Sequence, residues 1–371
     1  MATRAIQRVE VPVGRLDVSA YTVPTDEPES DGTFEWDSTT IVVVDAYAGG
    51  EHGLGYTYGP AAAAKLVQEL LVGVVGGRDA MDVEGTWLAM GAKLRNAGRP
   101  GLGSMAIAAV DVALWDLKAR LLGAPLLDVI GAVHGAVPVY GSGGFTSYSP
   151  ELVAEQLGGW AAAGIPRVKM KIGREPEQDP ARLDAARRAI GDGTELFVDA
   201  NGAYGREEAA VWAERLAAEW QSRWFEEPVS SADIEGLRLV RERAPRGLEI
   251  AAGEYGYVLA DFRNLLAGEA VDCLQADVTR CGGITGLLGV SRLVGEYGID
   301  LSGHCAPALS VHPLCAVQRL RHLEWFHDHV RLEAMLFDGV PKPSDGVVAP
   351  DRSRPGHGLE LKRTDAERYA A

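Results

Sequence analysis

"RVKMKIG", residues 167–173, is the segment that decides the fold. Its alternating apolar residues favour a β-strand, in which side chains two positions apart point to the same face. Lys169 and Lys171 would therefore project together, although two neighbouring ammonium groups repel each other. The pair predicts a charged site in which other groups balance the two lysines.

Similar short apolar segments recur along the rest of the chain. They are VPVYGS at residue 137, VKMKIG at 168, LFVDAN at 196, RWFEEP at 223, LEIAAGE at 248, DCLQADV at 272, IDLSGH at 299 and HLEWF at 322. Stretches of helical period, such as PELVAEQLGGWAAAG, lie between most of them. Alternating strands and helices predict parallel βαβ units, and eight strands fit an α/β barrel of the TIM type. A doubly wound open sheet is the alternative, but no G-x-G-x-x-G motif follows the first strand and no P-loop is present.

The chain before this repeat has a different pattern and predicts a separate α+β domain, residues 1–132. VEVPVG and TTIVVVDAYAG alternate as strands do, whereas residues 61–75, 83–98 and 104–131 have a helical period. Residues 22–38 are rich in Asp, Glu, Pro and Ser and predict a mobile loop. The barrel would then span residues 133–340, and residues 341–371 would return to the first domain.

Composition narrows the possible partners. The chain has 371 residues and a formal net charge of −16, which argues against nucleic acids and anionic membranes. The four cysteines form no C-x-x-C motif, and the first residues contain no apolar run typical of a signal peptide. No apolar run is long enough and free enough of charge to predict a transmembrane helix. We therefore expect a cytoplasmic protein with reduced thiols.

Polar residues stand at or near the ends of seven of the eight predicted strands. They are Lys169 and Lys171, Asp199 and Asn201, Glu226 and Glu227, Glu254, Asp277, His304, and Glu324. Taken singly, each could be a helix cap, a solvated surface group or a structural residue. The carboxyl ends of the strands form the catalytic face of a barrel, so their coincidence predicts an active site.

Three carboxylates from successive strand ends, Asp199, Glu226 and Glu254, predict a metal site. Without cysteine or a histidine pair they offer hard oxygen ligands, which suit Mg²⁺ before Mn²⁺ or Ca²⁺. The lysine pair would lie on one side of this site, and Asp277 with His304 on the far side. We therefore expect Mg²⁺ as the cofactor.

This set of motifs resembles the enolase superfamily, in particular its mandelate racemase-like branch, over essentially the whole chain. VDVALWDLKARLLGAPL (110–126) is similar to the family's signature helix, KMK to its K-x-K motif, and VDAN, FEEP and AAGE to its metal-ligand motifs. DVTRCGGIT (277–285) and GHCAPAL (303–309) resemble the segments that carry its aspartate and histidine. The resemblance implies a modified (β/α)7β barrel with an N-terminal α+β capping domain.

The resemblance also implies roles for the residues near the strand ends. Lys171 would be a general base, and Lys169 an electrostatic partner that contacts the substrate carboxylate. His304, oriented by Asp277, would be the acid/base on the opposite face, and Glu324 would hydrogen-bond the substrate carboxylate. A cationic neighbour and burial would lower the pKa of Lys171, whereas nearby carboxylates would raise it, and the sequence does not decide the balance.

Other residues would hold the metal ion or line the pocket. Asp199, Glu226 and Glu254 would ligate Mg²⁺, while Asn201, Arg280, Tyr140, Ser142 and Phe145 are candidate substrate contacts. Residues 22–38 correspond to the loop that closes over the barrel mouth. The substrate would be a small carboxylate, and the protein would be a homo-oligomer, either a dimer or an octamer.

The implied chemistry is removal of the proton α to a carboxylate, which gives an enediolate that Mg²⁺ and a cationic lysine stabilise. The favoured reaction is dehydration of an acid sugar, an aldonate or aldarate, to a 2-keto-3-deoxy acid. Racemisation or epimerisation of an α-hydroxy acid is the first alternative, because Lys171 and His304 could act on opposite faces.

Two further alternatives are cycloisomerisation and binding without catalysis. Relatives of the cycloisomerase type usually carry a lysine where this chain has Arg280, and arginine is a poor base because it stays protonated. His304 also argues against cycloisomerisation. A binding protein would be expected to lack a ligand or a base, and this chain lacks neither.

Overall fold

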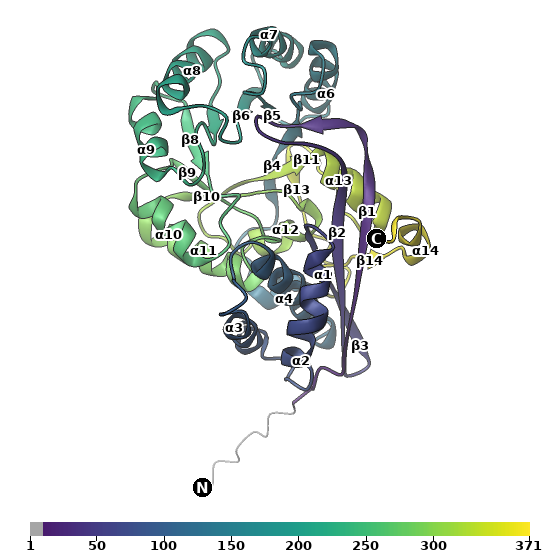
Figure 1. Cartoon of the computed structure of the whole chain (residues 1–371). Helices are drawn as coiled ribbons and strands as arrows, with labels where there is room; N and C mark the ends of the chain where they lie inside the picture. Colours follow the sequence, from purple (N-terminus) through teal and green to yellow (C-terminus); the bar gives the residue numbers. More distant parts are fainter. Residues whose placement is uncertain (1–9) are drawn as a thin grey trace.

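The computed structural model describes residues 10–371, and its centre is a closed barrel of eight parallel strands (Figure 1). The strands are β4 (Val137–Gly143), β5 (Arg167–Lys171), β6 (Glu195–Asp199), β7 (Trp224–Glu226), β8 (Glu249–Ala252), β9 (Cys273–Ala276), β10 (Asp300–Gly303) and β11 (Leu320–Phe326). They pair in chain order, and β11 closes the barrel by pairing with β4. Each predicted apolar segment overlaps one strand, which confirms the barrel.

Within the described residues, seven helices connect consecutive barrel strands, as a (β/α)7β barrel requires. They are α6 (Pro150–Ala162), α7 (Asp179–Ile190), α8 (Arg206–Glu219), α9 (Ile234–Arg243), α10 (Leu259–Ala267), α11 (Gly283–Tyr297) and α12 (Pro307–Leu314), and α13 (His327–Leu336) follows β11. Side-chain caps mark some helix starts: Ser149 accepts a hydrogen bond from Leu152 N at α6, and Asp233 accepts one from Gly236 N at α9.

The interior of the barrel is a packed core and not a pore. Tyr140, Phe197, Trp224, Ala251 and Cys273 form an apolar cluster inside it, each from a different strand. The rings of Phe197 and Trp224 stack with their centroids 5.3 Å apart. This floor leaves the carboxyl ends of the strands as the face on which a site can form.

The N-terminal domain combines an antiparallel sheet with helices. The sheet has the order β1 (Arg15–Ser30), β2 (Glu35–Ala48), β3 (Glu51–Tyr58). The helical segments are α1 (Ala62–Leu66), the π-helical η1 (Val67–Leu71), α2 (Val72–Val75), α3 (Val83–Lys93), α4 (Leu102–Leu121) and α5 (Leu126–Ile130). The helix α4 packs so closely on β3 that a Cβ at Gly53 or Gly55 would lie 2.2 Å from its backbone oxygens, which explains both glycines.

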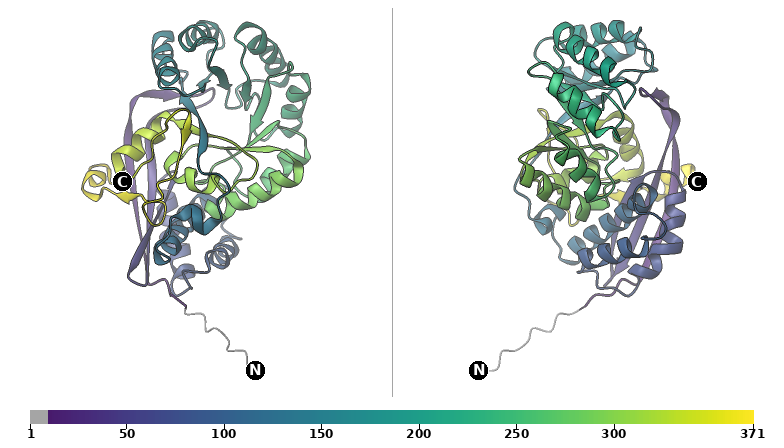
Figure 2. Two further views of the ribbon diagram at one scale, coloured as in Figure 1. Left: turned by 180° about the vertical axis from the view of Figure 1, so that it is seen from behind. Right: turned by 60° about the vertical axis from the view of Figure 1, so that its left-hand side comes forward.

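The prediction of a loop at residues 22–38 is wrong. These residues form the end of β1, a short turn and the start of β2, and the hairpin runs along the barrel with its tip bent toward the strand ends (Figures 1 and 2). The pairing is irregular between Pro24 and Glu29, because proline lacks the N–H that a ladder needs. Contacts with the barrel hold the tip in place: Thr146 N donates to Ser30 O at 2.8 Å, and His327 Nε2 lies 2.9 Å from Asp26 Oδ2.

Two predicted helices are interrupted. Residues 61–75 contain the π-helical turn η1 between α1 and α2. Residues 104–131 divide into α4 and α5, because Gly123 adopts a φ of 60° and Pro125 follows it.

The C-terminal residues contact first the barrel and then the N-terminal sheet. The strand β13 (Val347–Val348) pairs with β4, and β14 (Glu360–Leu361) pairs with β12 (Phe337–Asp338). The short helices α14 (Arg363–Ala366) and η2 (Glu367–Tyr369) follow, and Ala371 N donates to Ala20 O at 3.0 Å.

Two sequence predictions concern thiols and membranes. All four cysteines are buried and unpaired. Among the described helices, none has the length and apolar character needed to cross a bilayer. The predicted cytoplasmic location and the dimeric or octameric assembly stay predictions.

Candidate active site

Strand register places the first site residues at one level of the barrel. Lys171 lies opposite Asp199 across β5 and β6, and Asp199 lies opposite Glu226 across β6 and β7. Glu254 follows two residues after the end of β8. One oxygen of each carboxylate lies within 4.8 Å of the others, and all three side chains are buried. The three predicted metal ligands therefore form one cluster.

This cluster fits a hard divalent cation. Two further buried oxygens next to it in sequence, Asn201 Oδ1 and Glu227 Oε1, accept no hydrogen bond from the described residues. Oxygens without donors are what a cation that prefers six oxygen ligands can use. Asp199, Glu226 and Glu254 would hold Mg²⁺, which when bound supplies positive charge beside a substrate carboxyl group.

The backbone turns sharply directly after three of the strand ends. Asn201 has a φ of 46°, Glu227 of 39°, Cys305 of 49° and Ala306 of 42°, all in the left-handed region that disfavours non-glycine residues. Such positions cost energy and cluster at functional sites. Here they follow Asp199, Glu226 and His304 in the sequence, which are all predicted site residues.

The two lysines lie among the carboxylates. Lys169 is fully buried, with its Nζ 2.6 Å from Glu226 Oε1 and 2.8 Å from Glu324 Oε1. Lys171 Nζ lies 2.5 Å from Asp199 Oδ2. Burial lowers the pKa of Lys171, but the carboxylates Asp199, Glu254 and Glu226 together raise it by more, so the net pKa lies above its ordinary value. The lowering effect of Lys169 is thus outweighed by the carboxylates around Lys171.

The histidine and its aspartate form a fixed pair. His304 Nδ1 lies 2.8 Å from Asp277 Oδ2, and Asp277 Oδ1 accepts hydrogen bonds from the N–H and hydroxyl of Thr279, both at 2.7 Å. An aspartate held in this way accepts a hydrogen bond from Nδ1–H and leaves Nε2 as the reactive nitrogen. Burial lowers the pKa of His304, but the neighbouring Cys305, Glu254 and Glu324 raise it above its ordinary value.

Glu324 connects the lysine side of the site to the histidine side. Its Oε1 accepts a hydrogen bond from Ser142 Oγ at 2.6 Å and contacts Lys169. Its Oε2 accepts a hydrogen bond from Cys305 N at 3.2 Å and lies 3.4 Å from His304 Nε2. The cations and donors around it offset the cost of burial and hold its pKa below the ordinary value. Glu324 is therefore a buried carboxylate between the two candidate bases.

Arg280 bridges the metal cluster and the histidine pair. Its Nη1 lies 3.3 Å from Glu254 Oε1, and its Nε lies 3.7 Å from Asp277 Oδ2. Its guanidinium carbon stands 5.1 Å from the centre of the Tyr255 ring. Because arginine stays protonated, Arg280 acts as a fixed positive charge and not as a base.

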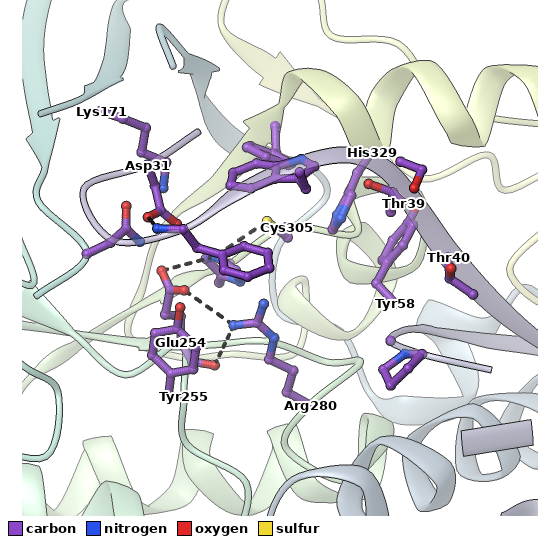
Figure 3. Close-up of a pocket in the computed structure, with 18 residues that line it drawn as sticks. Asp31, Thr39, Thr40, Tyr58, Lys171, Glu254, Tyr255, Arg280, Cys305 and His329 are labelled. Atoms are coloured by element: carbon purple, nitrogen blue, oxygen red, sulfur yellow. Dashed lines mark hydrogen bonds and ion pairs between the residues drawn. The ribbon is translucent and has the colours of Figure 1, made fainter. Parts of the chain in front are cut away.

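A cavity of about 500 Å³ opens between these residues and the N-terminal hairpin (Figure 3). Of the predicted site residues, Lys171, Asn201, Glu254, Arg280 and His304 line it. Buried beneath them are Lys169, Asp199, Glu226, Asp277 and Glu324. The structure thus brings the predicted polar residues into one site.

Three predicted substrate contacts do not line the cavity. Tyr140 belongs to the apolar floor of the barrel, below Lys169, whose Nζ lies 5.4 Å from its ring centre. Ser142 is buried and donates to Glu324. Phe145 packs edge-on against Trp36 with centroids 5.6 Å apart. They follow or belong to the first barrel strand as predicted, but their side chains support other residues.

The resemblance placed the segment 22–38 over the barrel mouth, but it named none of the residues that form the far side of the cavity, and Thr39, Tyr58 and His329 were missed. The N-terminal domain contributes Asp31, Phe34, Trp36, Thr39 and Tyr58, and α13 contributes His329. The first four belong to or border the segment 22–38 that was predicted as a loop. His329 could have been predicted, because it is a polar residue shortly after the eighth strand and residues in that position reach the catalytic face of a barrel.

Family comparison identifies both domains. Residues 21–131 match the family model "Mandelate racemase / muconate lactonizing enzyme, N-terminal domain", and residues 152–366 match "Enolase C-terminal domain-like". The chain belongs to the mandelate racemase/muconate lactonizing enzyme family, within the enolase superfamily.

Individual proteins resemble the chain over most of its length. A 3,6-anhydro-α-L-galactonate cycloisomerase of Streptomyces coelicolor is 33% identical over 94% of this chain and 97% of that protein. An L-talarate/galactarate dehydratase of Salmonella typhimurium is 32% identical over 78% of this chain and 74% of that protein.

Solved structures of family members agree with the fold. A mandelate racemase/muconate lactonizing enzyme-like protein from Rubrobacter xylanophilus is 60% identical, with a TM-score of 0.96 over 97% of this chain and all of that one. A racemase from Streptomyces coelicolor with bound magnesium has a TM-score of 0.90 and 31% identity over 97% of this chain and all of that one. Family members thus bind magnesium, and this chain has the buried carboxylate cluster that suits it.

Proposed function

We propose that this protein is a Mg²⁺-dependent acid-sugar dehydratase, which converts an aldonate or aldarate to a 2-keto-3-deoxy acid. The observation that carries the proposal is the pairing of two acid/base groups over one carboxylate cluster. Lys171 extends from β5, and His304 with Asp277 comes from the ends of β10 and β9. Both bases line the same cavity, so both can reach one substrate.

Each residue has a defined task in this reaction. The carboxylate cluster would hold the Mg²⁺ that attracts the substrate carboxyl group to the buried end of the cavity, and a cationic Lys169 offsets the charge that develops there. One base, Lys171 or His304, removes the α-proton. The β-hydroxyl then leaves as water, after taking a proton from His304 Nε2, whose Nδ1 is held by Asp277. The enol product tautomerises to the 2-keto-3-deoxy acid, so atoms balance without an added reactant.

The relatives support this reaction class. Besides the talarate/galactarate enzyme, family members named arabinonate, D-gluconate and L-rhamnonate dehydratases are 28%, 29% and 31% identical over most of this chain. All of these names describe removal of water from acid sugars.

Two other reactions have specific support. Two relatives, 33% and 28% identical, are named cycloisomerases. If the leaving oxygen is tethered in a ring, the same elimination opens the ring and no water is released. The presence of two bases also allows racemisation, and one similar structure is described as a racemase. The product separates these outcomes, because only dehydration yields an open-chain acid that has lost water.

The test is incubation of the protein with Mg²⁺ and a panel of aldonic, aldaric and anhydro-sugar acids, followed by mass spectrometry. A 2-keto acid that has lost water supports the dehydratase. A keto acid of unchanged mass supports the cycloisomerase, and α-deuterium incorporation in D₂O with inversion alone supports the racemase. Absence of all products, together with no Mg²⁺ binding in calorimetry, would refute the enzymatic proposal.

A further inference from the structure

The side of the cavity away from the metal cluster is neutral and largely aromatic. We define the distal wall as Thr39, Tyr58 and His329, which lie together on the opposite side of the cavity from Lys171 and Glu254 (Figure 3). The His329 ring stacks on Tyr58 with centroids 3.5 Å apart and planes within 10°. This stack holds both rings in place against the end of any ligand.

The hydrogen bond to His329 fixes which of its nitrogens can donate. Ala306 N donates to His329 Nδ1 at 3.2 Å, so Nδ1 carries no proton. A neutral imidazole with an accepting Nδ1 has its proton on Nε2. Burial lowers the pKa of His329 to about 3, in agreement with a neutral ring. In the described part of the chain no group is bonded to Nε2, which leaves this N–H as a donor for a ligand.

Thr39 offers the complementary group. Its hydroxyl donates to Asp328 Oδ2 at 2.5 Å, and Asp328 is buried and also paired with Arg331 at 2.7 Å. With its proton committed to Asp328, Thr39 Oγ1 can only accept. The distal wall therefore presents one donor and one acceptor, the combination that a single hydroxyl group satisfies.

The charges around the distal wall disfavour an anion. Among the described cavity residues of the N-terminal domain, the charged one is Asp31, a carboxylate. The cationic groups of the cavity on the barrel side are already balanced: Arg280 by Glu254 at 3.3 Å and Asp277 at 3.7 Å, and His304 by Asp277 at 2.8 Å. A second carboxylate placed here would lose its hydration and face the lone pairs of Thr39, and the neighbouring Arg331 is already paired with Asp328.

We propose that the cavity selects monocarboxylic acids whose far end is uncharged and carries a hydroxyl group, which His329 and Thr39 bind. Dicarboxylic acids of the same length are then poor ligands. This inference rests on the proposed function only in placing the reacting carboxylate at the metal cluster, and it narrows the substrate class from acid sugars in general to aldonates.

The test compares acids that differ only at the far end. Galactonate and galactarate, gluconate and glucarate, and mannonate and mannarate are pairs in which a terminal CH₂OH replaces a carboxylate. With Mg²⁺-loaded protein, kcat/KM is compared where turnover occurs and Kd from calorimetry where it does not. We expect the aldonate of the best pair to be favoured about tenfold or more, the difference expected for one unpaired buried charge or donor.

The terminal hydroxyl is tested with fuconate, the 6-deoxy form of galactonate, or the deoxy form of whichever aldonate binds best. The wild type should prefer the hydroxylated acid about five- to tenfold, the value of one buried hydrogen bond. His329→Phe keeps the stack on Tyr58 but lacks the donor, and Thr39→Val keeps the shape but lacks the acceptor. Either change should bring the hydroxyl preference close to one, whereas His52→Phe, at a histidine that stacks on Tyr47 and does not line the cavity, should leave it intact.

The outcomes separate this inference from the proposed function. If aldarates are dehydrated as well as aldonates, the inference is overturned while the dehydratase stands. If no acid is turned over but aldonates bind more tightly than aldarates, the inference stands and the dehydratase falls. An unchanged hydroxyl preference in folded His329→Phe and Thr39→Val, or no binding of any aldonate, also overturns the inference.

Discussion

Lys171 is the candidate base that sits closest to the metal cluster, at 2.5 Å from Asp199. Replacing it by methionine keeps the length of the side chain and removes both the base and a positive charge that competes for the carboxylates. We expect kcat to fall by about 10²- to 10⁴-fold, the usual contribution of one acid/base group. Mg²⁺ binding should be retained or become tighter, because one competing cation is gone. Calorimetric Mg²⁺ titration beside the keto-acid assay checks this, and loss of Mg²⁺ binding would contradict the assignment.

His304 can be separated from Lys171 by the variant His304→Asn. Asparagine can still hydrogen-bond Asp277, which holds His304 Nδ1 at 2.8 Å, but it cannot transfer a proton. We expect loss of dehydration, whereas α-deuterium exchange of one stereoisomer through Lys171 continues in D₂O. Proton NMR follows that exchange. Its complete loss while Mg²⁺ still binds would show that the two bases do not act independently.

At the scale of elements, a residue of the N-terminal domain caps a barrel helix. Asp111 on α4 is buried and accepts from Thr285 N at 2.9 Å and from Thr285 Oγ1 at 2.6 Å, in the first turn of α11. The N-cap residue of α11 is Gly282, which has no side chain to do so. The segment 277–282, which carries Arg280, leads directly into this helix.

Asp111→Ala should therefore destabilise the protein more than the loss of an exposed helix cap does. It leaves the part-buried Thr285 N–H without a partner, which costs about 1–3 kcal/mol in free energy of unfolding. Asp82→Ala, which removes a cap from Gly85 N at 3.2 Å near the surface, is the matched control and should cost about 1 kcal/mol. Urea unfolding measures both, and equal losses would mean that this contact between the domains adds no more stability than an exposed helix cap.

The elements that the sequence predicted well are those with a clear period. All eight barrel strands are short apolar runs, and the polar residues that follow them can be located by counting, as Asp199 and Glu226 show. The segment 22–38 was mispredicted because Pro24 and its acidic residues are unfavourable in a strand when judged locally. Long-range contacts decide the matter: Asp26 pairs with His327 and Thr39 with Asp328, over separations that no local pattern reports.

At the scale of the whole molecule, one half of the site could be predicted from the sequence and the other half could not. The barrel half follows from strand ends and a family resemblance. The other half exists only because the hairpin and β3 dock on the barrel, which brings Thr39 and Tyr58 next to His329. Tyr140 illustrates the converse, since the sequence places it on the right strand but cannot show that its ring fills the barrel floor.

Glu333 ties the N-terminal domain to the barrel. It lies buried on α13. Its carboxyl group accepts hydrogen bonds from Tyr56 Oη of β3 at 2.5 Å and from Ala308 N of α12 at 3.1 Å. Burial raises the pKa of Glu333 to about 8, although these hydrogen bonds oppose the shift. The helix α12 follows directly after His304, Cys305 and Ala306, so this carboxyl group connects the docking of the two domains to the histidine loop.

The raised pKa of Glu333 predicts how stability depends on pH. In the unfolded chain the group ionises near its ordinary pKa of 4.5, whereas the folded protein keeps it protonated up to about pH 8. Folding therefore takes up a proton between these values, and this group's stabilisation is lost as the pH rises through the window, by up to about 1.4 kcal/mol per pH unit. Glu333→Gln mimics the protonated form and cannot ionise, so the stability of the wild type relative to this variant should fall from pH 4.5 to 8. Urea unfolding across that range measures the difference, and a difference that stays constant or grows with pH would show that Glu333 is ionised in the folded protein.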